Sequence, residues 1–78
     1  MPLRHFRKPE FFRDEALMNE RIDDAKAIWK LISRKKFKDE ILMDCYERLI
    51  EDAAKAAGFF TVKDFEKWAR LEGIDLKP

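Results

Sequence analysis

Three residues of this 78-residue chain could serve as a nucleophile or a general base: His5, Ser33 and Cys45, each the only one of its type. Catalysis by any of them needs a second group held beside it. His5 has no partner at a metal-ligand spacing, and Ser33 could use only His5 as its base. Cys45 lies on an apolar helical stripe, where a small buried thiol is the usual outcome. We therefore predict that the protein is not an enzyme and holds no cofactor.

Adjacent acidic residues raise the question of a metal site. Neighbouring residues on a helix point about 100° apart, so the two carboxylates of such a pair do not converge on one ion. Solvated helix faces account for these residues, and we predict no metal site. The adjacent acidic residues are Asp14/Glu15, Asp23/Asp24, Asp39/Glu40 and Glu51/Asp52.

One compact basic cluster contains an aromatic residue: Arg34, Lys35, Lys36 and Lys38 flank Phe37. Such a cluster could contact the phosphates of a nucleic acid, with an affinity that falls steeply with salt. The alternative is that the cations stabilise the carboxyl end of a helix. Acidic residues follow at once in the sequence and would cancel part of the field.

Aromatic residues make up 13% of the chain, and several lie outside the predicted core. A domain of this size buries only about 60% of the surface of its unfolded chain. Some rings should therefore stay exposed in a single molecule, and aromatic residues mixed with arginines are typical of protein interfaces. The alternative is that the N-terminal segment folds back over its own core. The predicted partner-binding residues are Arg4, Phe6, Arg7, Phe11, Phe12, Arg13, Trp29 and Phe37.

The charge of the chain excludes a strongly basic nucleic-acid-binding protein, because 17 basic and 16 acidic residues leave a net charge of +1. The charges alternate in blocks of one sign, which favours pairing within a hairpin or between chains. No apolar run approaches the roughly 18 to 20 residues of a membrane span, so we expect no membrane partner. The first 13 residues are basic and lack the apolar stretch of a signal peptide, so we expect a cytoplasmic protein. A single cysteine excludes an intramolecular disulfide.

The fold class follows from composition and from the placement of proline and glycine. Between Pro9 and Gly58 the chain has neither residue, which β-rich domains of this size do not tolerate. Strong helix formers dominate, and β-branched residues are few. We predict an all-α fold with an extended N-terminal arm, residues 1–8, and a three-helix domain, residues 9–78. The predicted helices span about residues 10–35, 38–57 and 62–72.

Charge marks the predicted break between the first two helices. Pro9 suits the first turn of a helix, and apolar residues recur at helical spacing from Phe11 to Ile32. The cations at 34–38, followed directly by acidic residues, indicate that one helix ends and another begins. The alternative is one long helix, shared between copies in an oligomer. On the second helix we expect to find buried Leu42, Cys45, Leu49, Ala53 and Ala56, with Ile41, Tyr46 and Ile50 beside them.

The third helix has the clearest local signals. Thr61 is its expected N-cap, and Phe60 and Phe65 are placed as a hydrophobic staple. Gly58 and Gly73 should end the second and third helices with positive φ. Because the connection between these helices is short, they should be antiparallel neighbours or cross steeply.

Two functions fit these observations. The first is a non-enzymatic helical module that binds protein, either as a homodimer or as an accessory or regulatory subunit of a larger complex. The alternative is a nucleic-acid-associated protein that uses the basic cluster at 34–38 and the basic residues of the arm. The two differ in salt dependence, since phosphate contacts weaken steeply as salt is added.

Overall fold

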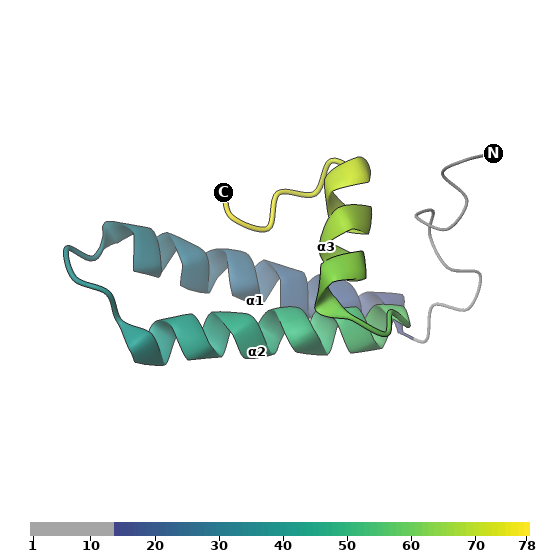
Figure 1. Cartoon of the computed structure of the whole chain (residues 1–78), viewed down its shortest axis with the longest axis horizontal. Coiled ribbons are helices and arrows are strands. Elements are labelled where there is room, and N and C mark those ends of the chain that lie inside the picture. The colour runs from purple at the N-terminus through teal and green to yellow at the C-terminus, as the bar shows by residue number, and fades with distance from the viewer. Residues whose placement is uncertain (1–13) are drawn as a thin grey trace.

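The computed structural model describes residues 14–78, which form three helices and, over that range, no strand (Figure 1). The helices are α1 (Glu15–Arg34), α2 (Glu40–Ala57) and α3 (Val62–Leu71). α1 and α2 form a long antiparallel hairpin, and α3 lies across the end of the hairpin where α1 begins (Figure 1). The predicted all-α, three-helix fold is confirmed, whereas the predicted arm lies outside the described residues. None of these three helices is both long enough and apolar enough to cross a membrane.

The loop between α1 and α2 confirms the predicted break. α1 ends at Arg34, and Lys35 has an extended backbone with ψ 140°. On the other side of the loop, the Asp39 carboxylate accepts hydrogen bonds from the backbone N–H groups of Ile41 and Leu42, both at 3.1 Å. Since N–H groups in a first turn have no acceptor within their own helix, this aspartate is the N-cap of α2. One continuous helix is therefore excluded.

α1 begins at Glu15, later than the predicted start near residue 10. Asp14 has an extended backbone, and its carboxylate accepts a hydrogen bond from the N–H of Leu17 at 2.9 Å. The Asp14 N–H donates to the carbonyl oxygen of Ala56 at 3.0 Å, in the last turn of α2. One residue thus caps α1 and satisfies a carbonyl that α2 leaves open. The prediction relied on Pro9, whereas the aspartate supplies the acceptor that a helix start needs.

The core lies between the helices of the hairpin and under α3. Small side chains let the hairpin close tightly, because Ala25, Ala53 and Ala57 are fully buried. Phe65 and Trp68 fill the larger space under α3. Each large side chain moved out of water in this way contributes about 1.5–3 kcal/mol. The other buried residues of the core are Met18, Ile22, Tyr46, Ile50, Ala54, Ala56 and Ala69.

Glycines end α2 and α3 as predicted. Gly58 has φ 90° and Gly73 has φ 77°, in the left-handed region that favours glycine. After each glycine, the N–H of the next residue donates back to a carbonyl in the last turn, at 2.9 Å for Phe59 and 2.8 Å for Ile74. This is the Schellman ending, and it directs both side chains onto the core. The tight turn after α2 lets α3 cross the hairpin steeply (Figure 1).

Thr61 caps α3 as predicted, but the predicted staple is wrong. The Thr61 hydroxyl accepts a hydrogen bond from the N–H of the third helical residue at 3.1 Å. Phe60 is 102% exposed and so cannot pack on Phe65. Phe59 takes its place, with its ring centroid 5.8 Å from that of Phe65. The Schellman turn is the cause, because it turns the first residue after the glycine inwards and the second outwards.

The buried face of α2 is rotated by one residue from the predicted stripe. Tyr46 is buried, whereas Cys45 is exposed and carries a free thiol. Ile41, expected beside the core, is 77% exposed. The predictions for Cys45 and Ile41 were therefore wrong. α2 packs against both α1 and α3, and this double contact centres its inner face on Tyr46 and Ile50.

Candidate functional site

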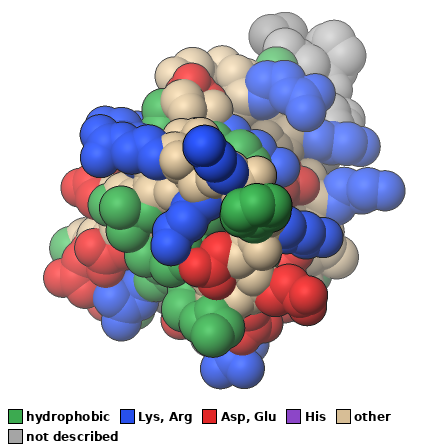
Figure 2. Space-filling view, turned by 90° about the vertical axis from the view of Figure 1, so that its left-hand side faces the viewer, with side chains coloured by type: hydrophobic (Ala, Val, Ile, Leu, Met, Phe, Trp, Pro, Cys, Tyr) green, Lys and Arg blue, Asp and Glu red, His purple; other side chains and the backbone are tan. Residues whose placement is uncertain are grey.

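The loop end of the hairpin exposes large apolar side chains. We call residues 34–41 the hairpin tip. Phe37 is 84% exposed and Ile41 is also far out in solvent. Both line one open concavity of about 440 Å³. Figure 2 looks onto this end of the molecule and shows hydrophobic side chains lying among lysine and arginine side chains.

Exposed cations surround the apolar side chains of the hairpin tip. Lys35 Nζ lies 3.6 Å from the Asp39 carboxylate. Across residues 14–78, the other three cations of the tip form no ion pair. These three cations, which keep their charge available to an external anion, are Arg34, Lys36 and Lys38.

The two carboxylates of the tip, Asp39 and Glu40, offset only part of the charge of its four cations. The Asp39 carboxylate is also engaged in starting α2. The hydrogen bond from the Leu42 N–H is the largest effect that holds the pKa of Asp39 below its ordinary value of 3.8. The Lys35 ammonium acts in the same direction, against the opposing effect of desolvation. The carboxylate is therefore ionised at neutral pH and is shared between the helix start and one lysine.

Ion pairs between α1 and α2 also do not neutralise the cations of the hairpin tip. The charge blocks of the sequence suggested ion pairs between the first two helices. The structure has such a pair at Arg21, whose Nε lies 4.0 Å from the Asp52 carboxylate on α2. The same guanidinium lies 2.9 Å from Glu20 and 3.8 Å from Asp24 on its own helix. This network lies in the first half of α1, away from the tip, so it does not neutralise the basic block at 34–38.

Trp29 lies in a separate groove of about 290 Å³. Its ring centroid is 5.2 Å from that of Tyr46 on α2. The segment after α3, residues 72–78, runs back over the hairpin, and we call it the tail (Figure 1). Lys77 of the tail places its Nζ 5.1 Å from the centroid of the Trp29 ring. A cation at this distance from an indole face is attracted by the ring. Trp29 is therefore half-buried and already in contact with a charge.

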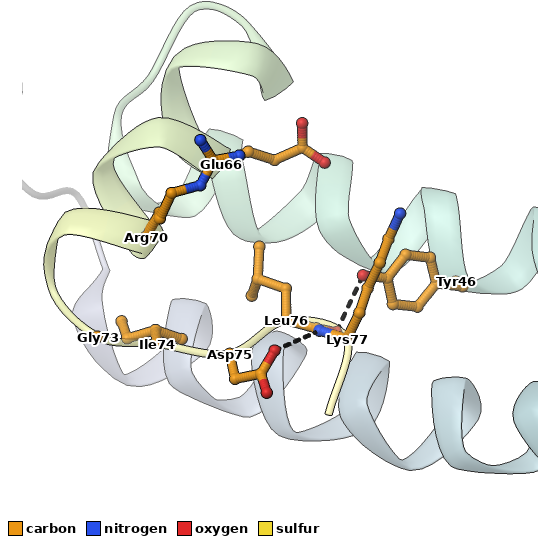
Figure 3. Close-up of a pocket in the computed structure, with 8 residues that line it drawn as sticks. All are labelled: Tyr46, Glu66, Arg70, Gly73, Ile74, Asp75, Leu76 and Lys77. Atoms are coloured by element: carbon orange, nitrogen blue, oxygen red, sulfur yellow. Dashed lines mark hydrogen bonds between the residues drawn. The ribbon is translucent and has the colours of Figure 1, made fainter.

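Tyr46 holds the tail in place. Its phenol donates a hydrogen bond to the carbonyl oxygen of Leu76 at 3.0 Å. Burial, followed by the charges of Glu66 and Asp75, raises the pKa of Tyr46 to about 12. The phenol is thus protonated at neutral pH and acts as a donor rather than as a base. Tyr46 and Lys77 both line a cavity of about 470 Å³, whose lining residues Figure 3 shows.

The structure brings part of the predicted site together. Phe37 and the four predicted phosphate contacts share the hairpin tip, whereas Trp29 lines a different groove. Sequence reasoning missed Ile41 as the exposed neighbour of Phe37. An apolar residue in the first turn after the Asp39 cap, four residues from an exposed phenylalanine, was the available signal. Outside the described residues lie His5 and the predicted contacts Arg4, Phe6, Arg7, Phe11, Phe12 and Arg13.

The surface of residues 14–78 carries exposed apolar side chains and exposed charged side chains. Among residues 14–78, no three side chains of histidine, cysteine, aspartate or glutamate gather as metal ligands. The Ser33 hydroxyl donates to the carbonyl oxygen of Lys30 at 2.9 Å, within α1. No protein-family model matches the chain, and comparisons with curated proteins and with solved structures found no match.

Proposed function

We propose that the chain is a non-enzymatic protein-binding module, acting as a homodimer or as an accessory or regulatory subunit of a larger complex, and that the hairpin tip is a contact surface. The observation that carries the proposal is the pair of large side chains, Phe37 and Ile41, that the fold leaves in water. Moving each of them into an interface gains about 1.5–3 kcal/mol. Apolar anchors surrounded by polar groups are the arrangement of interface hot spots.

The charge of the tip favours a partner of a particular kind. Arg34, Lys36 and Lys38 are unpaired within the described residues and stand beside the apolar anchors. A partner surface that has an apolar pocket rimmed by carboxylates complements both properties. Complementary charge speeds encounter and fixes orientation more than it adds affinity. We therefore expect the association rate to fall as salt is added, with a smaller effect on dissociation.

A nucleic-acid-associated role is the second candidate, and the exposed ring of Phe37 favours it. Aromatic rings stack on unpaired bases while neighbouring cations contact the phosphates. The tip presents one such ring, and the charge of the whole chain is only +1. Binding to a single-stranded oligonucleotide that weakens steeply with salt would favour this candidate over the first.

The exposed thiol of Cys45 supports the cytoplasmic location that we propose with this function. A free thiol on the surface persists in a reducing compartment, whereas secretory compartments convert such thiols into disulfides. Labelling of the endogenous protein with a thiol reagent in freshly lysed cells tests this. A free thiol is the expected result, and an intermolecular disulfide on Cys45 would contradict it.

Site-specific photo-cross-linking tests the role of the tip. A benzophenone side chain is introduced at Phe37 in the producing cells, and cross-linked products are separated by mass. The matched control is the same side chain at Phe60, which is fully exposed at the other end of α2. A contact through the tip predicts a discrete product at position 37 that is absent at position 60.

The products also separate the alternatives. A product of twice the mass of the chain indicates a homodimer, and a larger product indicates a subunit of a complex. Identical products at the two positions, or none at position 37, would contradict a contact at the tip. A cross-linked product that disappears after nuclease treatment would show that the tip contacts nucleic acid, and would favour the second candidate function.

A further inference from the structure

The groove beside Trp29 has an apolar, aromatic floor. We call it the aromatic groove. Its volume, about 290 Å³, is enough for a long side chain, and two ring systems stand at one side of it. The floor combines residues from all three helices, so it exists only once the domain has folded. The apolar residues that line it are Trp29, Met43, Tyr46, Ile50 and Val62.

Three carboxylates line the same groove: Glu47 and Glu51 from α2 and Glu66 from α3. Over residues 14–78, none of the three takes part in an ion pair. Carboxylates at the mouth of a groove with low-dielectric walls produce a negative potential that attracts cations. The face of an indole ring attracts cations as well. The aromatic floor of the groove and the carboxylates at its rim therefore both favour a cationic ligand.

A cation of this chain already occupies the groove. The ammonium of Lys77 lies over the ring of Trp29 at 5.1 Å from its centroid. The tail is held by the bond from the Tyr46 phenol to the carbonyl of Leu76, by the bond from the Lys77 N–H to the Asp75 carboxylate at 3.2 Å, and by Ile74 and Leu76 packed on the core. The Lys77 ammonium itself forms no ion pair within residues 14–78. One positive charge thus faces three carboxylates, which leaves an excess of negative charge in the groove.

We propose that the aromatic groove recognises a lysine- or arginine-bearing segment of a protein partner, and that Lys77 is the intramolecular occupant that this segment displaces. A segment with two or more cations neutralises more of the rim than Lys77 does alone. It can also place an aliphatic stem on the floor, as long basic side chains do. The tail then competes with the partner segment, because the segment binds only to molecules in which Lys77 has left the groove. This site is independent of the hairpin tip and has the opposite charge.

Nuclear magnetic resonance of the whole chain, titrated with pentalysine, tests the proposal. The chain has two tryptophans, so the indole N–H of Trp29 reports on the groove and that of Trp68, buried in the core, serves as the internal reference. Pentalysine is expected to move the Trp29 signal and to leave the Trp68 signal in place. Lys77→Ala should bind the peptide several-fold more tightly, because its groove is open. Pentaglutamate is the control peptide and should move neither signal.

Charge removal at the rim distinguishes a site from diffuse attraction. Glu51→Gln should weaken pentalysine binding several-fold, whereas Glu72→Gln, an exposed carboxylate outside the groove, should not. Equal effects of the two variants, or an unmoved Trp29 signal, would overturn the proposed site. An affinity that does not change in Lys77→Ala would overturn the displacement by a partner. A Trp29 signal that moves with protein concentration and no peptide would assign the groove to a second copy and overturn the proposal of a separate partner.

Discussion

Tyr46 is the only tyrosine of the chain, and its environment makes a quantitative prediction about alkaline stability. The perturbation is Tyr46→Phe, which removes the phenol oxygen and keeps the ring on the core. At neutral pH the variant loses the hydrogen bond to the Leu76 carbonyl, which is 3.0 Å long. Such a bond contributes about 1 kcal/mol to the free energy of unfolding, so the wild type should be the more stable protein by that amount.

The sign of this difference should change as the pH rises. Burial, and then the charges of Glu66 and Asp75, raise the pKa of Tyr46 from its ordinary value of 10.0 to about 12. The folded state therefore holds the phenolic proton in a range of pH where the unfolded chain has lost it. Stability from this group is fully present below pH 10 and is lost as the pH rises towards 12. The loss is on the order of 1 kcal/mol near pH 11 and grows further as the pH passes 12.

Urea unfolding of both proteins, followed by circular dichroism between neutral pH and about pH 11, measures the effect. All other side chains are common to the two proteins, so the difference between them isolates Tyr46. The free energy of unfolding of the wild type should exceed that of Tyr46→Phe by about 1 kcal/mol at neutral pH, and this difference should disappear by about pH 11. Ultraviolet absorbance of the single tyrosinate gives the pKa directly. A pKa near 10, or a stability difference that stays constant with pH, would refute the burial of the phenol under the tail.

Further predictions concern single positions. Asp39→Ala should lower the urea concentration at the midpoint of unfolding because it leaves the first N–H groups of α2 without an acceptor, whereas Asp39→Asn should lower it less. Because the pKa of Asp39 is lowered in the folded state, its stabilising effect should fade as the pH falls through that pKa, which an acid titration of wild type against Asp39→Asn checks. Phe59→Ala should lower the free energy of unfolding by about 2 kcal/mol and Phe60→Ala by less than about 0.5 kcal/mol, and equal costs would argue against the observed turn. Cys45 should react with a maleimide in the native protein about as fast as in the urea-unfolded protein because its side chain is exposed, whereas slow labelling that needs denaturant would show it to be buried.

The sequence predicted those features that depend on neighbours along the chain. The Thr61 cap, the two glycine endings and the break before Asp39 are set within about five residues. A hydrogen bond from a capping side chain, or a positive φ, needs no information from elsewhere in the fold. These features were therefore predicted correctly, and together they fix the number of helices and their order.

The inner face of α2 could not be predicted in the same way. An apolar stripe that contains Leu42, Cys45 and Leu49 is a good match to one partner helix, but α2 packs against two. The second contact comes from α3 and the tail, and it turns Tyr46 and Ile50 inwards. The hydrogen bond from the Tyr46 phenol to the Leu76 carbonyl joins residues that are 30 positions apart, and no local sequence pattern predicts such a contact. For the same reason, no local pattern showed that Lys77 would lie over the ring of Trp29, a predicted partner-binding residue.

We propose the hairpin tip, rather than the exposed ring of Phe60, as the contact surface because of the residues that surround each of them. Phe60 is the most exposed aromatic side chain of the described residues, but a single apolar side chain on a surface is ordinary. Phe37 shares one concavity with Ile41, so two large apolar side chains can leave the water together in a single contact. Three of the cations beside them, Arg34, Lys36 and Lys38, form no ion pair within residues 14–78, whereas a cluster that served only to end α1 would need no exposed ring between its charges. Exposed apolar area and positive charge thus meet at the tip, and this combination supports the contact that we propose there.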